Sequence, residues 1–194
     1  MPRFSDVPKF TRNANYSVTV PWNHVEENIK RFTDRGKNKE VGGLILNPDF
    51  QRGHVWNNKQ QTKYVEYIIR GGYGQRDIMF NCSTWMTTYK TPLVLVDGKQ
   101  RLEAVRKFLR NELLVFDHFL NEYEDKLGVF DCSFLFHVNN LKTREEVLQW
   151  YLDLNFTGTP HSKNELTKVK HLLTIERLRR KHGFEVEKEN WNEV

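Results

Sequence analysis

The chain has 194 residues, a formal net charge of +5, and a composition of 38% hydrophobic and 28% charged residues. This length suffices for a domain with a buried core and no disulfide or metal staples, and the composition argues against a disordered chain. No apolar run approaches the roughly 18 residues of a transmembrane helix, and the polar N-terminus lacks the apolar centre of a signal peptide.

In the first half of the chain, hydrophobic periodicity predicts alternating strands and helices. Strands are expected over residues 16–20, 42–46 and 78–82. Helices are expected over 22–35 and 58–70, the second ending at a Gly-Gly pair. A loop over residues 47–56 leads into the second helix.

The second half begins with Leu93–Val96, an unbroken apolar run typical of a buried strand. Asp97 and Gly98 form a turn signal, and a helix is expected over residues 100–111. A strand over 130–138 and helices over 144–154 and 162–182 follow, the last opened by a capping box at Ser162. With no repeat, low-complexity tract or linker, the sequence predicts one α+β domain.

Cys82 and Cys132 have no spacing typical of a zinc site or a redox pair. We therefore expect two buried thiols and a cytoplasmic protein without membrane contact. The seven histidines are scattered, which favours structural or surface roles over zinc binding. The positive charge favours polyanionic partners.

The turn after the buried strand has the features of an anion site. A helix start presents backbone N–H groups without intrahelical acceptors, and the helix dipole attracts negative charge there. Gly98 lets a phosphate approach the backbone, Arg101 can donate two hydrogen bonds to phosphate oxygens, and Lys99 adds a positive charge.

Asp97 needs a separate explanation, because a carboxylate beside a phosphate is repulsive. A Mg²⁺ ion bound by Asp97, or a role of Asp97 as a base toward water, would resolve this. The alternative is a plain Asp97-Gly98 turn, followed by solvated basic residues at the helix start. On composition and spacing alone, the two interpretations carry equal weight.

Three segments in a fixed order resemble the motifs of a known family. They read N-P-D-F-Q-R-G-H-V-W over 47–56, V-D-G-K-Q-R-L over 96–102, and L-N-F-T-G-T-P-H-S-K-N-E-L over 154–166. They are similar to the P-x-x-Q-R-x-x-V-W, D-G-Q-Q-R and L-N-x-x-G-x-P-L-S-x-x-E-L motifs of the GmrS-like N-terminal domain of GmrSD modification-dependent restriction enzymes. The resemblance spans roughly residues 44–173, and three ordered motifs are far more specific than one.

The resemblance implies an α+β, ParB/sulfiredoxin-like domain, with a small mixed sheet packed with several helices. Such domains bind a nucleoside triphosphate, in many members hydrolyse it, and commonly act on or alongside DNA in restriction, phage defence or partition. In this interpretation residues 41–182 form the nucleotide-binding domain. Residues 1–40 add a strand and a helix to the same domain, and residues 183–194 form a tail.

Carried over residue by residue, the second motif supplies the centre of the site. Arg101, Lys99 and the backbone at Gly98 bind phosphate. Asp97 binds Mg²⁺ or orients water, and Gln100 positions a phosphate or the attacking water. Asp97 and Gln100 are thus the catalytic candidates.

The first motif supplies the opposite wall of the site through Gln51 and Arg52, although Arg52 could instead form a structural salt bridge. Trp56 is interpreted as a core anchor that seats the loop.

The third motif supplies a second rim through Asn155, Thr159 and Ser162. Their alternative roles are a helix stop at Asn155 and a helix cap at Ser162.

The final predicted helix has a basic face that could contact DNA phosphates. Its candidate residues are Lys168, Lys170, Arg177, Arg179 and Arg180. The alternatives are a solvated helix face and a surface for a partner domain.

The sequence departs from the family in two motif positions and in its length. Lys99 replaces a glutamine, which is compatible with phosphate binding but bears on hydrolysis, and His161 replaces a leucine. The family's restriction enzymes also carry a C-terminal H-N-H nuclease domain, and no such motif occurs before Val194. We therefore expect a separate nuclease subunit, a second copy of the chain, or a domain that acts alone.

Three functions are consistent with these features. The first is a DNA-associated domain that binds, and by resemblance hydrolyses, a nucleoside triphosphate with Mg²⁺. The second is a catalytically silent binding or regulatory module, such as a decoy or inhibitor. The third is a ParB-like DNA nuclease that acts at the same site.

Overall fold

A five-stranded mixed sheet in the order β1-β5-β3-β4-β2 forms the centre of the computed structural model, which describes residues 3, 6–11, 14–51, 55–128, 132–155 and 163–183. The strands are β1 (Tyr16–Pro21), β2 (Leu44–Ile45), β3 (Asp77–Asn81), β4 (Leu93–Asp97) and β5 (Ser133–Asn139). β1 is antiparallel to β5, β5 is parallel to β3, β3 is antiparallel to β4, and β4 is parallel to β2.

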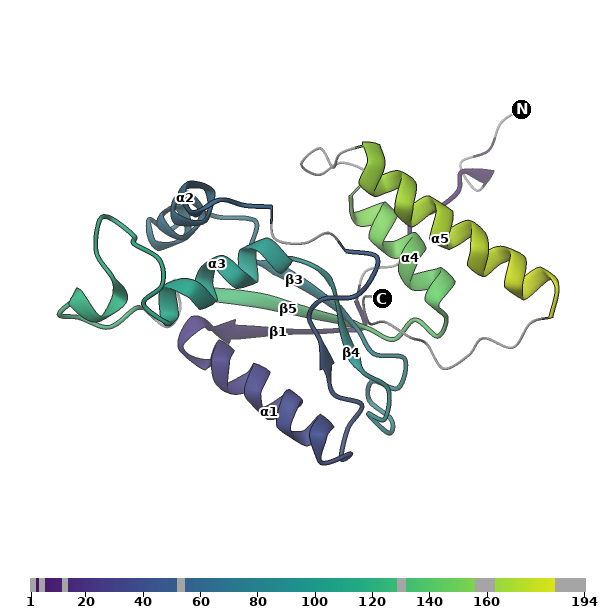
Figure 1. Ribbon diagram of the computed structural model, residues 1–194, viewed down its shortest axis with the longest axis horizontal. Coiled ribbons are helices and arrows are strands. Elements are labelled where there is room, and N and C mark those ends of the chain that lie inside the picture. Colours follow the sequence, from purple (N-terminus) through teal and green to yellow (C-terminus); the bar gives the residue numbers. More distant parts are fainter. Residues whose placement is uncertain are drawn as a thin grey trace.

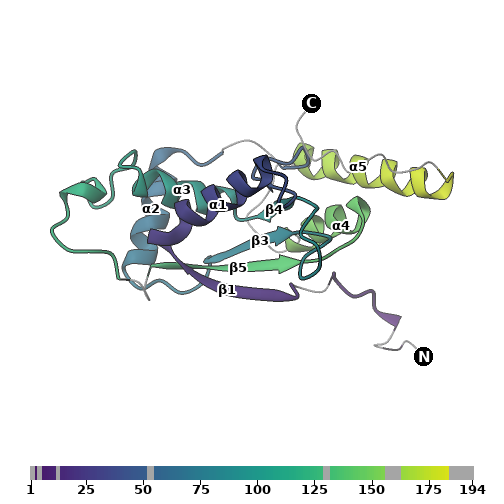
Figure 2. The same cartoon turned by 90° about the horizontal axis from the view of Figure 1, so that it is seen from below.

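The described helices are α1 (Val25–Lys37), α2 (Asn58–Ile69), α3 (Lys99–Leu109), α4 (Arg144–Leu154) and α5 (Lys163–Lys181), with short 3₁₀ turns η2 (Trp22–His24) and η3 (Leu120–Glu122). Figure 2 shows α1 and α3 on the same side of the sheet, with α2 beside α3 at one end of it. Helices α4 and α5 lie side by side at the other end of the molecule from α2 (Figure 1). The mixed sheet with its helices confirms the predicted α+β class.

β4 separates two hydrophobic cores, because alternate side chains of a strand point to opposite faces. Leu93 and Leu95 belong to the core shared with α1, α2 and α3. Val94 and Val96 belong to the core shared with α4 and α5. All four side chains are buried, which confirms the predicted buried strand.

The predicted elements are present, and their ends differ by a few residues. The strand expected over 42–46 pairs only at Leu44 and Ile45 among the described residues, since Gly43 has a positive φ of 88°. The helix expected from residue 100 begins at Lys99. β5 begins at Ser133, while residues 129–131 lie outside the described part. The helix expected from 22 is a 3₁₀ turn followed by α1.

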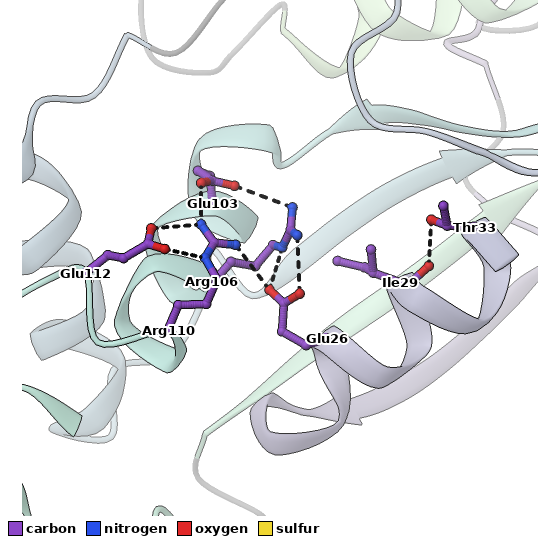
Figure 3. A network of polar contacts seen from close by, with 7 residues as sticks. All are labelled: Glu26, Ile29, Thr33, Glu103, Arg106, Arg110 and Glu112. Carbon is purple, nitrogen blue, oxygen red and sulfur yellow. Dashed lines mark hydrogen bonds and ion pairs between the residues drawn. The ribbon is translucent and has the colours of Figure 1, made fainter. Parts of the chain in front are cut away.

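Helix α3 is fixed to α1 by a network of charged side chains (Figure 3). Arg106 donates to both carboxylate oxygens of Glu26, at 2.6 and 3.2 Å. Arg110 contacts the same carboxylate at 3.4 Å and also pairs with Glu103 at 3.0 Å and Glu112 at 2.9 Å. These contacts hold the C-terminal half of α3, while its first residue, Lys99, lies only two positions after the end of β4 at Asp97.

Cys82 and Cys132 are both buried free thiols, as expected. Among the described residues, no helix is long and apolar enough to cross a membrane.

A largely buried ion-pair network joins α4 and α5 to the loop after β2. The Arg144 guanidinium pairs with Asp49 and lies 3.5 Å from Glu176. The side chains of Arg144 and Glu176 are only 8% and 7% exposed. Removing one member of a buried ion pair leaves an uncompensated buried charge.

We expect Arg144→Ala to lower the free energy of unfolding by about 3 kcal/mol, because Asp49 and Glu176 lose their shared cation. Urea denaturation followed by circular dichroism measures this. The matched control is Arg177→Ala, which removes an exposed arginine from the Glu145 pair at 3.3 Å. The control should change stability by less than about 1 kcal/mol. Equal effects of the two substitutions would contradict the assignment.

Candidate functional site

The candidate site begins at Gly98, which caps the N-terminus of α3 in a left-handed conformation, with a φ of 97°. A Cβ atom built at Gly98 would lie 2.6 Å from Ile78 Cδ1 and 3.1 Å from the Asp77 carbonyl oxygen. Both the backbone conformation and this close packing against β3 require glycine. The Gly98 carbonyl then accepts the first helical hydrogen bond from Leu102 N at 2.8 Å.

The first turn of α3 therefore starts directly at the end of the buried strand. Gly98 provides no side-chain cap, and no acidic residue occurs in the first turn of α3. Within α3 itself no carboxylate therefore offsets the helix dipole, and the carboxylate that precedes Gly98, Asp97, is paired with Arg101. This arrangement suits an anion.

Asp97 and Arg101 form an ion pair across this turn, with side chains 35% and 19% exposed. The pair gives the Asp97 carboxylate a cationic partner and holds the Arg101 guanidinium beside the helix start. Arg101 Nε is buried and has no hydrogen-bond partner among the described residues. The guanidinium thus has donor capacity that these residues do not use.

Gln100 connects the turn to the first motif. Its Oε1 atom accepts hydrogen bonds from the backbone N–H groups of Val55 and Trp56, both at 3.1 Å. Trp56 then packs against the Tyr64 ring, with centroids 5.4 Å apart, and joins the core, as the predicted anchor should.

Gln51 connects the other end of the same loop to β4. Its Nε2 atom donates to the Leu95 carbonyl oxygen at 2.7 Å, and the residue is 5% exposed. Its Oε1 atom is buried and has no partner among the described residues. Gln51 and Gln100 thus fix the loop on both sides of residues 52–54. Arg52 itself lies outside the described residues.

The loop is also held from the α4–α5 side, by Asp49 and Arg144, which the sequence did not single out for the site, and by Lys168, a predicted DNA contact. Asp49 pairs with Arg144, and the Asp49 carbonyl oxygen accepts from Lys168 Nζ at 2.7 Å. The available sequence signal for Asp49 was its charge, two positions before Gln51. Its partners are distant in sequence, so this signal did not identify them.

Tyr64 is influenced by two positive charges beside the site, those of Arg101 and Arg76. Burial raises the pKa of the Tyr64 phenol above its usual range, and the positive charges of Arg101 and Arg76 partly offset this. The phenol therefore stays neutral and donates to the Gln75 carbonyl oxygen at 2.8 Å. Tyr64 thus bonds to the loop before β3 and also lies within the electrostatic influence of Arg101.

The third motif is described at its start, Leu154 and Asn155, and at its end, where residues 163–166 begin α5. Asn155 is the C-cap of α4 and donates from Nδ2 to the Tyr151 carbonyl oxygen at 2.7 Å, as a helix stop would. Thr159 and Ser162 lie outside the described residues.

Three of the five basic candidates on α5 contact other parts of the chain, and a fourth, Arg179, pairs within the helix. Lys168 contacts the Asp49 carbonyl, Arg177 and Arg180 pair with Glu145, and Arg179 pairs with Glu176. Lys170 is exposed. Exposed ion pairs are weak, so these arginines can still exchange partners with phosphate.

The described residues contain no group of three or more His, Cys, Asp or Glu side chains that could hold a metal ion. His137 has a structural environment, since its ring nitrogens contact Ser17 Oγ and Asp77 Oδ1, both at 2.7 Å. An apolar cavity of about 320 Å³ lies between β1 and α1, near Leu93 and Trp85. It is at the opposite end of β4 from Asp97.

The fold and this turn define a class of protein, an α+β domain in which a buried strand leads through glycine into a basic helix start. The chain matches the family described as "GmrSD restriction endonuclease, N-terminal domain" over residues 29–172, and it belongs to that family. The resemblance noted from the motifs is thereby confirmed. Membership associates the chain with restriction and phage-defence systems. No curated protein and no solved structure matches the chain, and the ParB-like arrangement stays a prediction.

We expect Gly98→Ala to destabilise the protein by more than the roughly 1–2 kcal/mol of a left-handed alanine, because its Cβ also meets Ile78 and Asp77. The matched control is Gly74→Ala. Gly74 has a similar φ of 87°, and nothing lies within 4 Å of its added Cβ. Urea denaturation compares the two variants. Equal losses would show that close packing does not constrain the turn.

Proposed function

We propose that this chain is a nucleotide-binding, DNA-associated domain of a restriction or phage-defence system. The observation that supports it best is the Asp97–Arg101 ion pair at the glycine-capped start of α3, to which Gln100 ties the loop of the first motif. Backbone N–H groups of a helix start and an arginine fork are the two groups proteins use most directly for phosphate.

In this proposal the turn binds the phosphates of a nucleoside triphosphate. The start of α3 and Arg101 contact phosphate oxygens, and Lys99 adds charge. Arg52 and Gln51 form the facing wall. The buried donor at Arg101 Nε and the buried acceptor at Gln51 Oε1, which lack partners among the described residues, are consistent with a site shaped for a polar ligand. Thr159, Ser162 and Asn155 would form the second rim.

Mg²⁺ fits this proposal through one protein ligand. Mg²⁺ is commonly held by one or two carboxylates together with substrate phosphates and water. Asp97 is the carboxylate of the turn and is partly exposed. The ion would neutralise charge on the phosphates. Asp97 itself would orient both the ion and Arg101.

A binding module without turnover is the second candidate function, and the position of Gln100 favours it. Its Oε1 atom already accepts two backbone hydrogen bonds, from Val55 and Trp56. The side chain therefore serves as a brace for the loop, which competes with a role in orienting an attacking water. Lys99 in place of the family's glutamine also favours binding without turnover.

One incubation separates binding, hydrolysis and nuclease action. Purified protein is mixed with Mg²⁺, each nucleoside triphosphate and plasmid DNA, and phosphate release and nicking are measured. Phosphate release without nicking selects a nucleotidase, nicking selects a nuclease, and neither selects the binding module. Adding a nuclease subunit from a restriction system tests the proposed partner.

The DNA-associated part of the proposal is supported by the family and by the net charge of +5. Lys170 and the exposed arginines of α5 are the proposed phosphate contacts, with Lys168 tying the same helix to the loop of the site. Binding through such contacts weakens steeply with salt.

We expect Arg101→Ala to weaken nucleoside triphosphate binding by at least about tenfold, because a charge-assisted hydrogen bond contributes roughly 1.5–3 kcal/mol. Isothermal titration calorimetry measures this. Arg35→Ala is the matched control, since Arg35 pairs on the surface of α1 with Glu40 at 3.0 Å. Equal affinities of wild type and Arg101→Ala would overturn the assignment.

A further inference from the structure

A second surface, on α2 and the loop that follows it, has features that the nucleotide site does not use. Exposed residues at helical spacing line one side of α2, and the loop after the helix carries Tyr73. Tyr73 is 91% exposed. We call this surface the α2 stripe; its members are Lys59, Lys63, Tyr67, Arg70 and Tyr73.

Three side chains hold the loop that carries Tyr73 by hydrogen bonds to its backbone. Arg76 donates to the Gly72 carbonyl oxygen at 2.9 Å, and Tyr67 donates to the Tyr73 carbonyl oxygen. Tyr64 donates to the Gln75 carbonyl oxygen at 2.8 Å. Three carbonyl groups of one short loop are thus held, while the Tyr73 ring makes no hydrogen bond or ring contact with the described residues.

The backbone conformation of this loop also helps to hold it in place. A Cβ atom at Gly72 would lie 2.5 Å from the Tyr67 ring, so the ring packs directly against the glycine. Gly71, Gly74 and Gln75 have positive φ angles of 82°, 87° and 52°. An aromatic side chain presented on a braced loop loses little entropy when a partner covers it.

The charges of the α2 stripe indicate the partner. Lys59, Lys63 and Arg70 are exposed and positive. Arg70 lies over the Phe116 ring at 5.1 Å, and the nearby Glu66 is engaged by Phe116 N at 3.0 Å. Proteins that bind single-stranded nucleic acid combine such a positive track with aromatic side chains on which unpaired bases stack.

The α2 stripe also lies next to the candidate phosphate turn. The loop ends at Asp77, whose carbonyl oxygen packs against Gly98. Tyr73 is four residues before Asp77, a span of at most about 14 Å.

We propose that the α2 stripe binds single-stranded DNA, with an unpaired base stacked on Tyr73 and the backbone phosphates along Lys63 and Lys59. The inference rests on the DNA-associated part of the proposed function and is independent of nucleotide binding at Arg101. Duplex DNA does not offer the face of a base, so the surface selects unpaired strands.

Fluorescence anisotropy of a labelled oligothymidylate with the full chain tests this. Tyr73→Ala should weaken binding by at least about fivefold, the effect of losing one stacked base. Tyr73→Phe keeps the ring and should stay within about twofold of wild type. Lys63→Ala should lower the slope of log affinity against log salt by about 0.7.

The control is Phe10→Ala, which removes another exposed aromatic ring, 64% exposed. The N-terminal segment that carries it lies at the other end of the molecule from α2 (Figures 1 and 2). Unchanged affinity in Tyr73→Ala, or displacement of the probe by duplex DNA or RNA more readily than by single-stranded DNA, would overturn the inference.

Calorimetry on Tyr73→Ala separates this inference from the nucleotide site. Nucleoside triphosphate affinity should equal that of wild type, since Tyr73 is outside the turn. Tyr73-dependent DNA binding in a protein that binds no nucleotide would uphold the α2 stripe and reject the nucleotide site. Absence of all DNA binding in wild type would reject the α2 stripe along with DNA association.

Discussion

Burial of β4 on both faces is the constraint on which the rest of the structure depends. A shift of one residue would exchange Leu93 and Leu95, which face α1 to α3, with Val94 and Val96, which face α4 and α5. The two cores differ in shape and in partners, so the register of the strand is fixed. Asp97 therefore always reaches the end of the sheet, and the packing of Gly98 against β3 sets the direction in which α3 leaves. The position of the Asp97–Arg101 turn, the proposed phosphate site, therefore follows from the packing of the core.

Two glutamine side chains then attach the loop between β2 and α2 to β4 and to the start of α3. Gln51 is anchored to Leu95 on β4, and Gln100 is anchored to the loop at Val55 and Trp56. Arg144 and Lys168 hold the same loop at Asp49 from the α4–α5 side. These contacts hold the described parts of the loop on both sides of residues 52–54, and a preorganised loop of this kind would favour binding at the proposed phosphate site. They also couple the loop to α5, the helix with the basic candidates.

The sequence predicted the elements and the turn better than it predicted the contacts. β4, α3 and α4 follow from local patterns, an apolar run and helical spacing, which a single sequence displays. The Asp97–Arg101 pair has the i, i+4 spacing of helix neighbours and could have been read locally. Gln100 and Val55 are separated by 45 residues and Arg144 and Asp49 by 95, and such partners follow only from the topology of the sheet. The exposure of Tyr73 and the bracing of its loop are likewise properties of the folded chain.

The proposed phosphate turn and the α2 stripe differ in chemistry, one formed by backbone and arginine, the other by an aromatic ring and lysines. Phosphate binding at the turn is the central proposal, and amide NMR tests it directly. Inorganic phosphate or a nucleoside triphosphate is titrated into the isotope-labelled chain, and the amide shifts are followed. Phosphate binding at the turn should give the largest, saturable shifts at Gly98, Lys99, Gln100 and Arg101, with smaller shifts at Val55 and Trp56 through Gln100. Saturable shifts centred elsewhere, with the start of α3 unchanged, would contradict it.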